Sequence, residues 1–148
     1  MAGLAKILNG HVLNRSNERV NLKDRKYQGQ VFGLYFGASW CQPCRAFTSL
    51  LSEIYEEFHR EKQFKVIFVS ADSDERSYKE YYKSMPWLAI DFRDQHIRDT
   101  LITNYNVTDV PKLILLDGDS GKTLCTNAKE QILHLDTEGK NFPWKSSR

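Results

Sequence analysis

Hydrophobic positions along the chain predict a sheet built from buried strands. Residues 31–36, 65–70 and 113–116 carry nearly continuous apolar runs, which are typical of strands covered on both faces. Turn-forming residues at 117–121 follow the third run and predict a hairpin into a fourth strand over 122–125. The first thirty residues are polar with short apolar alternations and predict one or two short edge strands.

Helices are expected between these strands. Apolar residues recur at helical spacing from residue 41 to 59, and Pro43 suits the first turn because no backbone N–H is needed there. Residues 72–74 offer caps for a second helix, and further helices are expected over 94–105 and 128–133. Parallel strands need right-handed crossovers, whereas a hairpin needs an antiparallel edge. The order predicts an α/β fold with a mixed central β-sheet flanked by helices, an N-terminal β extension and a C-terminal hairpin plus helix.

Length and composition limit the class of protein. The 148 residues suffice for one hydrophobic core, so we expect a single domain over 1–148. Hydrophobic residues make up 41% and charged residues 27%, as in globular chains. The 21 basic and 19 acidic residues are well mixed, so direct nucleic-acid binding is not expected. The absence of a long apolar run argues against a membrane span.

Cysteine usage points to a reducing compartment. Three cysteines, an odd number, do not form a disulfide-stapled secreted scaffold. Residues 1–10 lack the apolar stretch of a signal peptide. We therefore expect the protein in the cytoplasm, with the nucleus as a second location, where a close cysteine pair indicates chemistry or metal binding.

Cys41 and Cys44 form the main chemical signal of the sequence. They are three residues apart at a strand-to-helix junction, so both sulfurs lie on one face of the first helical turn. Unpaired N–H groups and the positive end of the helix dipole stabilise a thiolate at Cys41. Lowering a thiol pKa from about 8.5 to about 7 raises its thiolate fraction at pH 7 about 16-fold. We predict thiol–disulfide exchange, in which Cys41 attacks a substrate disulfide and Cys44 resolves the mixed disulfide.

A zinc half-site is the alternative interpretation of this pair. A lone C-x-x-C needs two further ligands, and no two of the candidates have ligand spacing: Cys125, His11, His59, His96 and His134. We expect no metal and no bound cofactor, because an external dithiol or a reductase can supply the electrons.

Val110 and Pro111 are the second element of interest. A Pro directly before a buried strand fits a cis peptide in a tight turn, although an ordinary trans Pro is the commoner case on the residues alone. Beside the cysteine pair, this Pro leaves a backbone edge free for an incoming extended peptide.

These motifs together resemble a known family. Trp40-Cys41-Gln42-Pro43-Cys44-Arg45, followed by Val110-Pro111, resembles the thioredoxin superfamily. Residues 37–41, 84–89, 119–121 and 142–145 resemble its tryparedoxin and nucleoredoxin branch, and the resemblance covers nearly the whole chain after about residue 5. It implies a thioredoxin fold, a cis bond before Pro111, Cys41 as nucleophile and Cys44 as resolving thiol.

Departures from the family pattern change the expected chemistry. Thioredoxins proper hold a buried Asp where this chain has Tyr35, so a proton relay from a carboxylate there is not expected. Gln42 replaces the Pro that is usual in this branch. Tryparedoxins bind trypanothione through a Trp, an acidic residue and an Arg, whose positions here hold Ala71, Ser73 and Asn127. The sequence thus disfavours trypanothione as reductant and favours a nucleoredoxin-like protein that acts on protein disulfides.

Several other residues allow two interpretations. Trp40 is expected to shield the site and present a flat apolar contact. Arg45 either keeps the site electropositive or is a solvated helix charge. Trp87 either flanks the site, by analogy with the family, or belongs to an aromatic core cluster. Asp72 either faces the site or caps a helix. Cys125 is either a small hydrophobic residue in a strand or a regulatory or intermolecular thiol.

The predicted function is that of a protein-disulfide reductase with a dithiol mechanism and a role in cell redox homeostasis. Its expected partners are client proteins that contain disulfides and an upstream dithiol donor or reductase. The alternative is a redox-regulated binding protein, whose cysteine pair controls a signalling partner or the thiols of a transcription factor.

Overall fold

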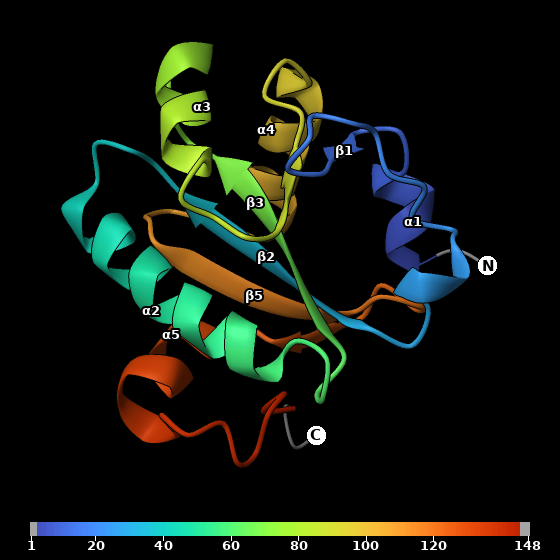
Figure 1. The fold of residues 1–148 in the computed structure, drawn as a ribbon, viewed down its shortest axis with the longest axis vertical. Helices are drawn as coiled ribbons and strands as arrows, with labels where there is room; N and C mark the ends of the chain where they lie inside the picture. The colour runs from blue at the N-terminus through green and yellow to red at the C-terminus, as the bar shows by residue number, and fades with distance from the viewer. Residues whose placement is uncertain (1–2, 146–148) are drawn as a thin grey trace.

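A mixed six-stranded sheet forms the centre of the protein (Figure 1). The computed structural model describes residues 3–145, so the ends of the predicted domain, 1–2 and 146–148, lie outside it. The strand order is β1-β4-β3-β2-β5-β6. The strands are β1 (Val12–Leu13), β2 (Val31–Gly37), β3 (Phe64–Ser70), β4 (Leu88–Ile90), β5 (Lys112–Asp117) and β6 (Thr123–Cys125). β2, β3 and β4 are parallel, whereas β1, β5 and β6 run antiparallel to their neighbours.

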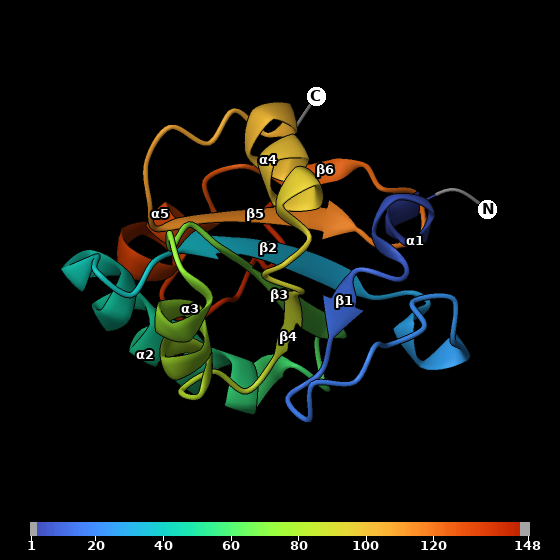
Figure 2. The same cartoon turned by 90° about the horizontal axis from the view of Figure 1, so that it is seen from above.

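Helices cover both faces of this sheet (Figure 2). Helices α2 and α3 and the segment of α5 and η2 pack on one face, and α1 and α4 pack on the other. The helical segments are α1 (Gly3–Leu8), η1 (Arg25–Tyr27, 3-10), α2 (Gln42–Phe58), α3 (Glu75–Tyr82), α4 (Gln95–Asn104), α5 (Ala128–Glu130) and η2 (Gln131–Leu135, a π-helical turn).

The central strand β2 shows why its sequence is apolar throughout. Successive side chains of a strand point to opposite faces. Phe32 and Leu34 belong to the core beneath α1 and α4, and Tyr35 belongs to the core beneath α2 and α3. Both faces are therefore buried, as the continuous apolar run predicted. The same alternation directs the Tyr35 ring toward the helix that carries the cysteine pair.

Most predicted elements are confirmed, and the errors lie in short segments. The three buried strands, the hairpin into β6 and the helices α2, α3 and α4 occur where expected. The N-terminal β extension is confirmed as the short edge strand β1, but helix α1, which precedes it and buries Leu4 and Leu8, was not predicted. Strand β4 was not predicted, because three residues after Pro86 are too short for a periodic pattern. The last helix extends to Leu135 rather than 133.

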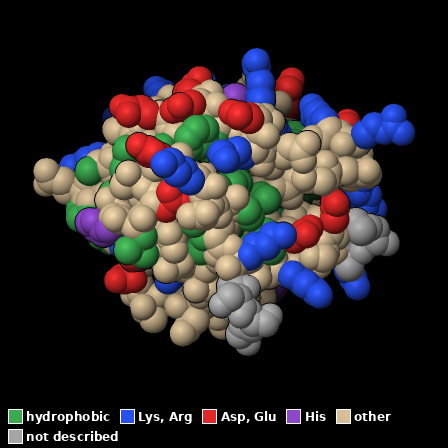
Figure 3. All heavy atoms as spheres, turned by 90° about the horizontal axis from the view of Figure 1, so that it is seen from below, with side chains coloured by type: hydrophobic (Ala, Val, Ile, Leu, Met, Phe, Trp, Pro, Cys, Tyr) green, Lys and Arg blue, Asp and Glu red, His purple; other side chains and the backbone are tan. Residues whose placement is uncertain are grey.

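The surface carries both charge signs. On the face shown in Figure 3, basic and acidic side chains lie among one another around hydrophobic ones, so that face has no continuous basic stripe. Within residues 3–145, none of the helices has the length and apolar character that crossing a bilayer requires.

Candidate active site

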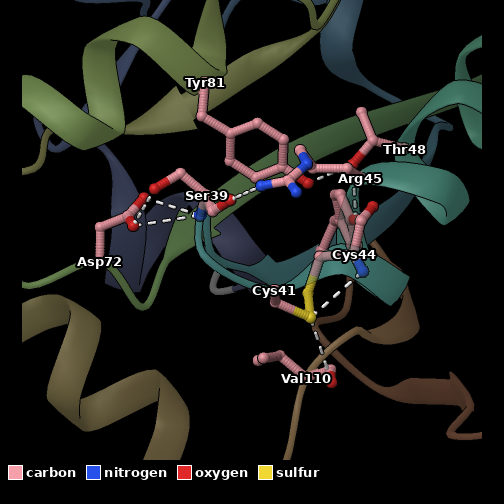
Figure 4. The surroundings of a disulfide bond; sticks show 9 residues. Ser39, Cys41, Cys44, Arg45, Thr48, Asp72, Tyr81 and Val110 are labelled. Carbon is pink, nitrogen blue, oxygen red and sulfur yellow. Dashed lines mark hydrogen bonds between the residues drawn. A yellow bond between two sulfur atoms is a disulfide. The ribbon is translucent and has the colours of Figure 1, made fainter.

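The loop between β2 and α2 places the cysteine pair at the start of a helix (Figure 4). β2 ends at Gly37 and α2 begins at Gln42, with Cys41 as the N-cap residue and Pro43 in the first turn. The N–H of Cys44 donates to Cys41 Sγ at 3.2 Å. The sulfur of Cys41 thus receives one of the free N–H groups of the helix end, as predicted from the sequence.

Cys41 and Cys44 are joined by a disulfide, with their Cα atoms 5.2 Å apart. Cys41 retains 6% of its surface, whereas Cys44 is fully buried. Of the two cysteines, only Cys41 therefore keeps any exposed surface. Across the residues that the structure describes, no group of three or more His, Cys, Asp or Glu side chains is arranged to hold a metal ion.

The turn before β5 lies against the same disulfide. The Val110–Pro111 peptide bond is cis, as the family resemblance implied. The carbonyl oxygen of Val110 lies 3.8 Å from Cys41 Sγ, although 69 residues separate them in sequence. The backbone before Pro111 is therefore adjacent to Cys41 Sγ.

A groove of about 430 Å³ opens next to this contact. Its walls are mostly apolar and come from the ends of β2 and β3, the redox loop (residues 38–41), helix α4 and the segment after it: Phe36, Trp40, Ala71, Ile102, Val107, Thr108, Asp109 and Val110. Trp40 is 66% exposed, so most of its indole surface is free for contact. With this exposure the indole does not shield the site as expected, and its role as a flat apolar contact for a substrate stays a prediction.

Ser39 is held from two sides by oppositely charged residues. Its N–H donates to the carboxylate of Asp72 at 3.0 and 3.2 Å, and its hydroxyl donates to the same carboxylate at 2.7 Å. Its carbonyl accepts a hydrogen bond from the Arg45 guanidinium. Asp72 does not cap α3, since that role belongs to Asp74, which accepts from the Ser77 N–H at 3.0 Å. Of the two interpretations of Asp72, the one that places it toward the site is confirmed.

A chain of three buried hydroxyl groups ends at the resolving cysteine. The Tyr35 hydroxyl donates to the carbonyl of Cys44 at 3.0 Å and lies 2.7 Å from Thr48 Oγ1, which lies 2.6 Å from the Tyr81 hydroxyl. Because each hydroxyl has one proton, Thr48 donates to Tyr35 and Tyr81 donates to Thr48. Burial raises the pKa of both tyrosines. The chain is therefore neutral, and Tyr35 is not a carboxylate-like proton acceptor.

Sequence reasoning did not single out Thr48, Tyr81 or Ser39. Thr48 follows Cys44 by one helical turn, and that spacing places it beside the resolving cysteine. Tyr81 could not be recognised from the sequence, because its approach to Thr48 from α3 depends on tertiary packing.

The remaining predicted residues lie at varying distances from the chemistry. Gln42 and Pro43 are exposed at the start of α2. Trp87 is 2% exposed and packs edge-on against the rings of Tyr35 and Tyr55, so it belongs to the core and does not line the groove. Cys125 is a buried free thiol in β6, and burial raises its pKa, as befits a small hydrophobic residue.

Comparison with known proteins assigns this geometry to a family. Residues 29–123 match the family model described as Thioredoxin-like. The chain belongs to this family. It lies in the tryparedoxin and nucleoredoxin branch, because it is 40% identical to tryparedoxin of Trypanosoma brucei brucei over 97% of this chain and 99% of that protein. It is also 37% identical to human nucleoredoxin, over 86% of this chain but only 29% of that protein.

Solved structures agree with this placement. A tryparedoxin II complexed with glutathionylspermidine superposes with a TM-score of 0.91 at 35% identity, covering 97% of this chain and 99% of that one. The Cys41–Cys44 pair at the start of α2 and the thioredoxin fold make the protein a thiol–disulfide oxidoreductase. The nucleoredoxin likeness does not fit better than the tryparedoxin likeness, because the tryparedoxins match over their whole length.

Proposed function

We propose that this oxidoreductase reduces disulfides of client proteins and is regenerated by an external dithiol or a reductase. The supporting observation is the position of Cys41 Sγ, 3.8 Å from the Val110 carbonyl and next to the apolar groove. An extended client segment can pair with the backbone before Pro111 while an apolar side chain enters the groove. A disulfide within this client segment is thereby brought next to Cys41 Sγ.

The catalytic cycle follows from the difference in exposure between the two cysteines. The Cys41 thiolate attacks one sulfur of the client disulfide, forms a mixed disulfide and releases the other client sulfur as a thiolate. Cys44 then attacks Cys41 Sγ, which closes the internal disulfide and releases the second client thiol. The client gains two electrons and two protons. An external dithiol returns the same two electrons and two protons to the protein.

The electron donor is proposed to be a dithiol or reductase other than trypanothione. By the family resemblance, the positions that match the trypanothione-binding residues of tryparedoxins are Ala71, which lines the groove, and the exposed Ser73 and Asn127. None of these side chains offers a charge or an aromatic face to a polyamine conjugate. We place this reaction in the cytoplasm, with the nucleus as a second location.

Reduction of insulin by dithiothreitol tests this function. We expect the wild-type protein to accelerate the reaction and Cys41→Ser to have no activity, while Cys125→Ser retains the wild-type rate as the matched cysteine control. Full activity of Cys41→Ser would refute the proposal. The donor is tested by comparing dithiothreitol, thioredoxin reductase with NADPH, and a glutathione–spermidine dithiol at equal concentrations.

A redox-regulated binding protein remains the competing function, and the exposed indole of Trp40 beside the groove is the observation that favours it. A Cys44→Ser variant traps clients as mixed disulfides in a cell extract. Many different trapped clients support general reduction. A few partners that also bind Cys41→Ser without a covalent bond support regulated binding instead.

A further inference from the structure

Asp72 is a buried carboxylate whose contacts serve the redox loop. It is 4% exposed, and within residues 3–145 its hydrogen-bond donors are neutral groups of Ser39 and Ser70. A buried charge without a cationic partner is costly unless hydrogen bonds compensate it. Three of the four bonds come from Ser39, two residues before Cys41. The carboxylate therefore fixes the backbone from which Trp40 and Cys41 follow.

Arg45 opposes Asp72 across the same residue (Figure 4). Its guanidinium binds the Ser39 carbonyl, so Ser39 lies between a negative and a positive side chain. Both charges act on the neighbouring Tyr81 hydroxyl. Burial is the main cause that raises the pKa of Tyr81. Of the two nearby charges, Arg45 lowers this pKa and Asp72 raises it. The two side chains thus exert opposite effects on one ionisable group of the site.

We propose that the charge of Asp72, which Ser39 holds beside the loop before Cys41, sets the reducing strength of the Cys41–Cys44 pair. The inference concerns the dithiol itself and does not depend on which clients or donor it meets. A negative charge near Cys41 disfavours its thiolate, and a disfavoured thiolate makes the disulfide less oxidising. Screening between Asp72 and Cys41 is weak because both are buried. Two further charged residues belong to this region: Arg45 on α2, which binds the Ser39 carbonyl, and Asp109, an exposed residue that lines the groove.

Equilibration with glutathione tests the proposal. In this reaction the protein disulfide and two glutathione molecules give the protein dithiol and one glutathione disulfide. We expect Asp72→Asn to raise this equilibrium constant about threefold and to lower the Cys41 pKa by about half a unit, measured by thiolate absorbance or alkylation rate against pH. Arg45→Gln is expected to change both quantities in the opposite direction.

Two control variants separate charge from geometry. Ser39→Ala removes the 2.7 Å hydroxyl bond but keeps both charges, so its equilibrium constant should stay within about 1.5-fold of wild type. Asp74→Asn removes a neighbouring carboxylate that caps α3, and it should leave the constant unchanged. Where Asp72→Asn does not fold, Asp72→Ser keeps an acceptor oxygen without the charge and has the same expected shift. The proposal is overturned if the Asp72 variants match wild type, or if Asp74→Asn shifts the constant equally.

Discussion

The hydroxyl of Tyr35 donates a hydrogen bond to the carbonyl of Cys44, 3.0 Å away, at the position where thioredoxins proper hold a buried carboxylate. A neutral donor at this position binds the backbone of the resolving cysteine and takes no proton from its thiol. The proton of Cys44 must therefore leave with the departing client thiol or with water. This relationship separates the chemistry of the chain from that of a carboxylate-assisted thioredoxin.

Tyr35→Phe should weaken the fold more than it weakens catalysis. The variant removes a buried bond to Cys44 and leaves Thr48 without its acceptor, so we expect a loss of about 1–2 kcal/mol in the free energy of unfolding. Tyr81→Phe should cost less, because every remaining hydroxyl keeps an acceptor for its proton. Urea unfolding of the single and double variants measures both effects. Loss of one limb of the pH–rate profile in Tyr35→Phe would show that Tyr35 transfers protons after all.

Trp40→Ala should impair the use of protein clients and spare the reaction with the small reductant dithiothreitol. The exposed indole offers contact surface at the groove, so we expect KM for insulin to rise about three- to tenfold. Reduction of the protein by dithiothreitol should stay unchanged. Leu135→Ala is the matched control, because Leu135 is 67% exposed and lies outside the groove. Equal effects of the two variants would remove Trp40 from client binding.

Acid stability should depend on Asp91. Burial acts to raise the pKa of this carboxyl, but hydrogen bonds from Arg93 and the charges of Arg93 and Arg19 outweigh it, and the pKa is lowered. The charged form of Asp91 is therefore favoured in the folded state. Its contribution to the free energy of unfolding is present above pH about 4 and is lost as the pH falls through the lowered pKa of the folded state. The Tm difference between wild type and Asp91→Asn should shrink between pH 6 and pH 3. A constant difference would contradict this assignment.

Cys125 should be inert in the folded protein. Burial raises the pKa of its thiol, and its sulfur lies 3.1 Å from Asn127 Oδ1. Titration of the reduced protein with a thiol reagent should modify Cys41 first, and Cys125 only after denaturant is added. Rapid modification of Cys125 in the native protein would indicate a reactive role for this residue.

The sequence alone predicted those features whose residue pattern lies within one helix or strand. The apolar runs of β2 and β3 and the helical spacing of α2 predicted the layers of the fold, and the C-x-x-C spacing located the disulfide. Apart from the contact between Val110 and the cysteine pair, contacts between distant segments were not predicted from it. Asp72 meets Ser39, and Tyr81 meets Thr48, only because β3 and α3 pack beside the redox loop. Strand β4 exists through its pairing with β3 and β1, since three residues carry no periodicity.

The central claim is that Cys41 is the sulfur that attacks a client and Cys44 the one that resolves the bond. Mass spectrometry of Cys44→Ser after incubation with a disulfide-containing peptide measures this directly. The account predicts a stable mixed disulfide that maps to Cys41, and its disappearance in the wild-type protein. A mixed disulfide that maps to Cys125, or none at all, would contradict it.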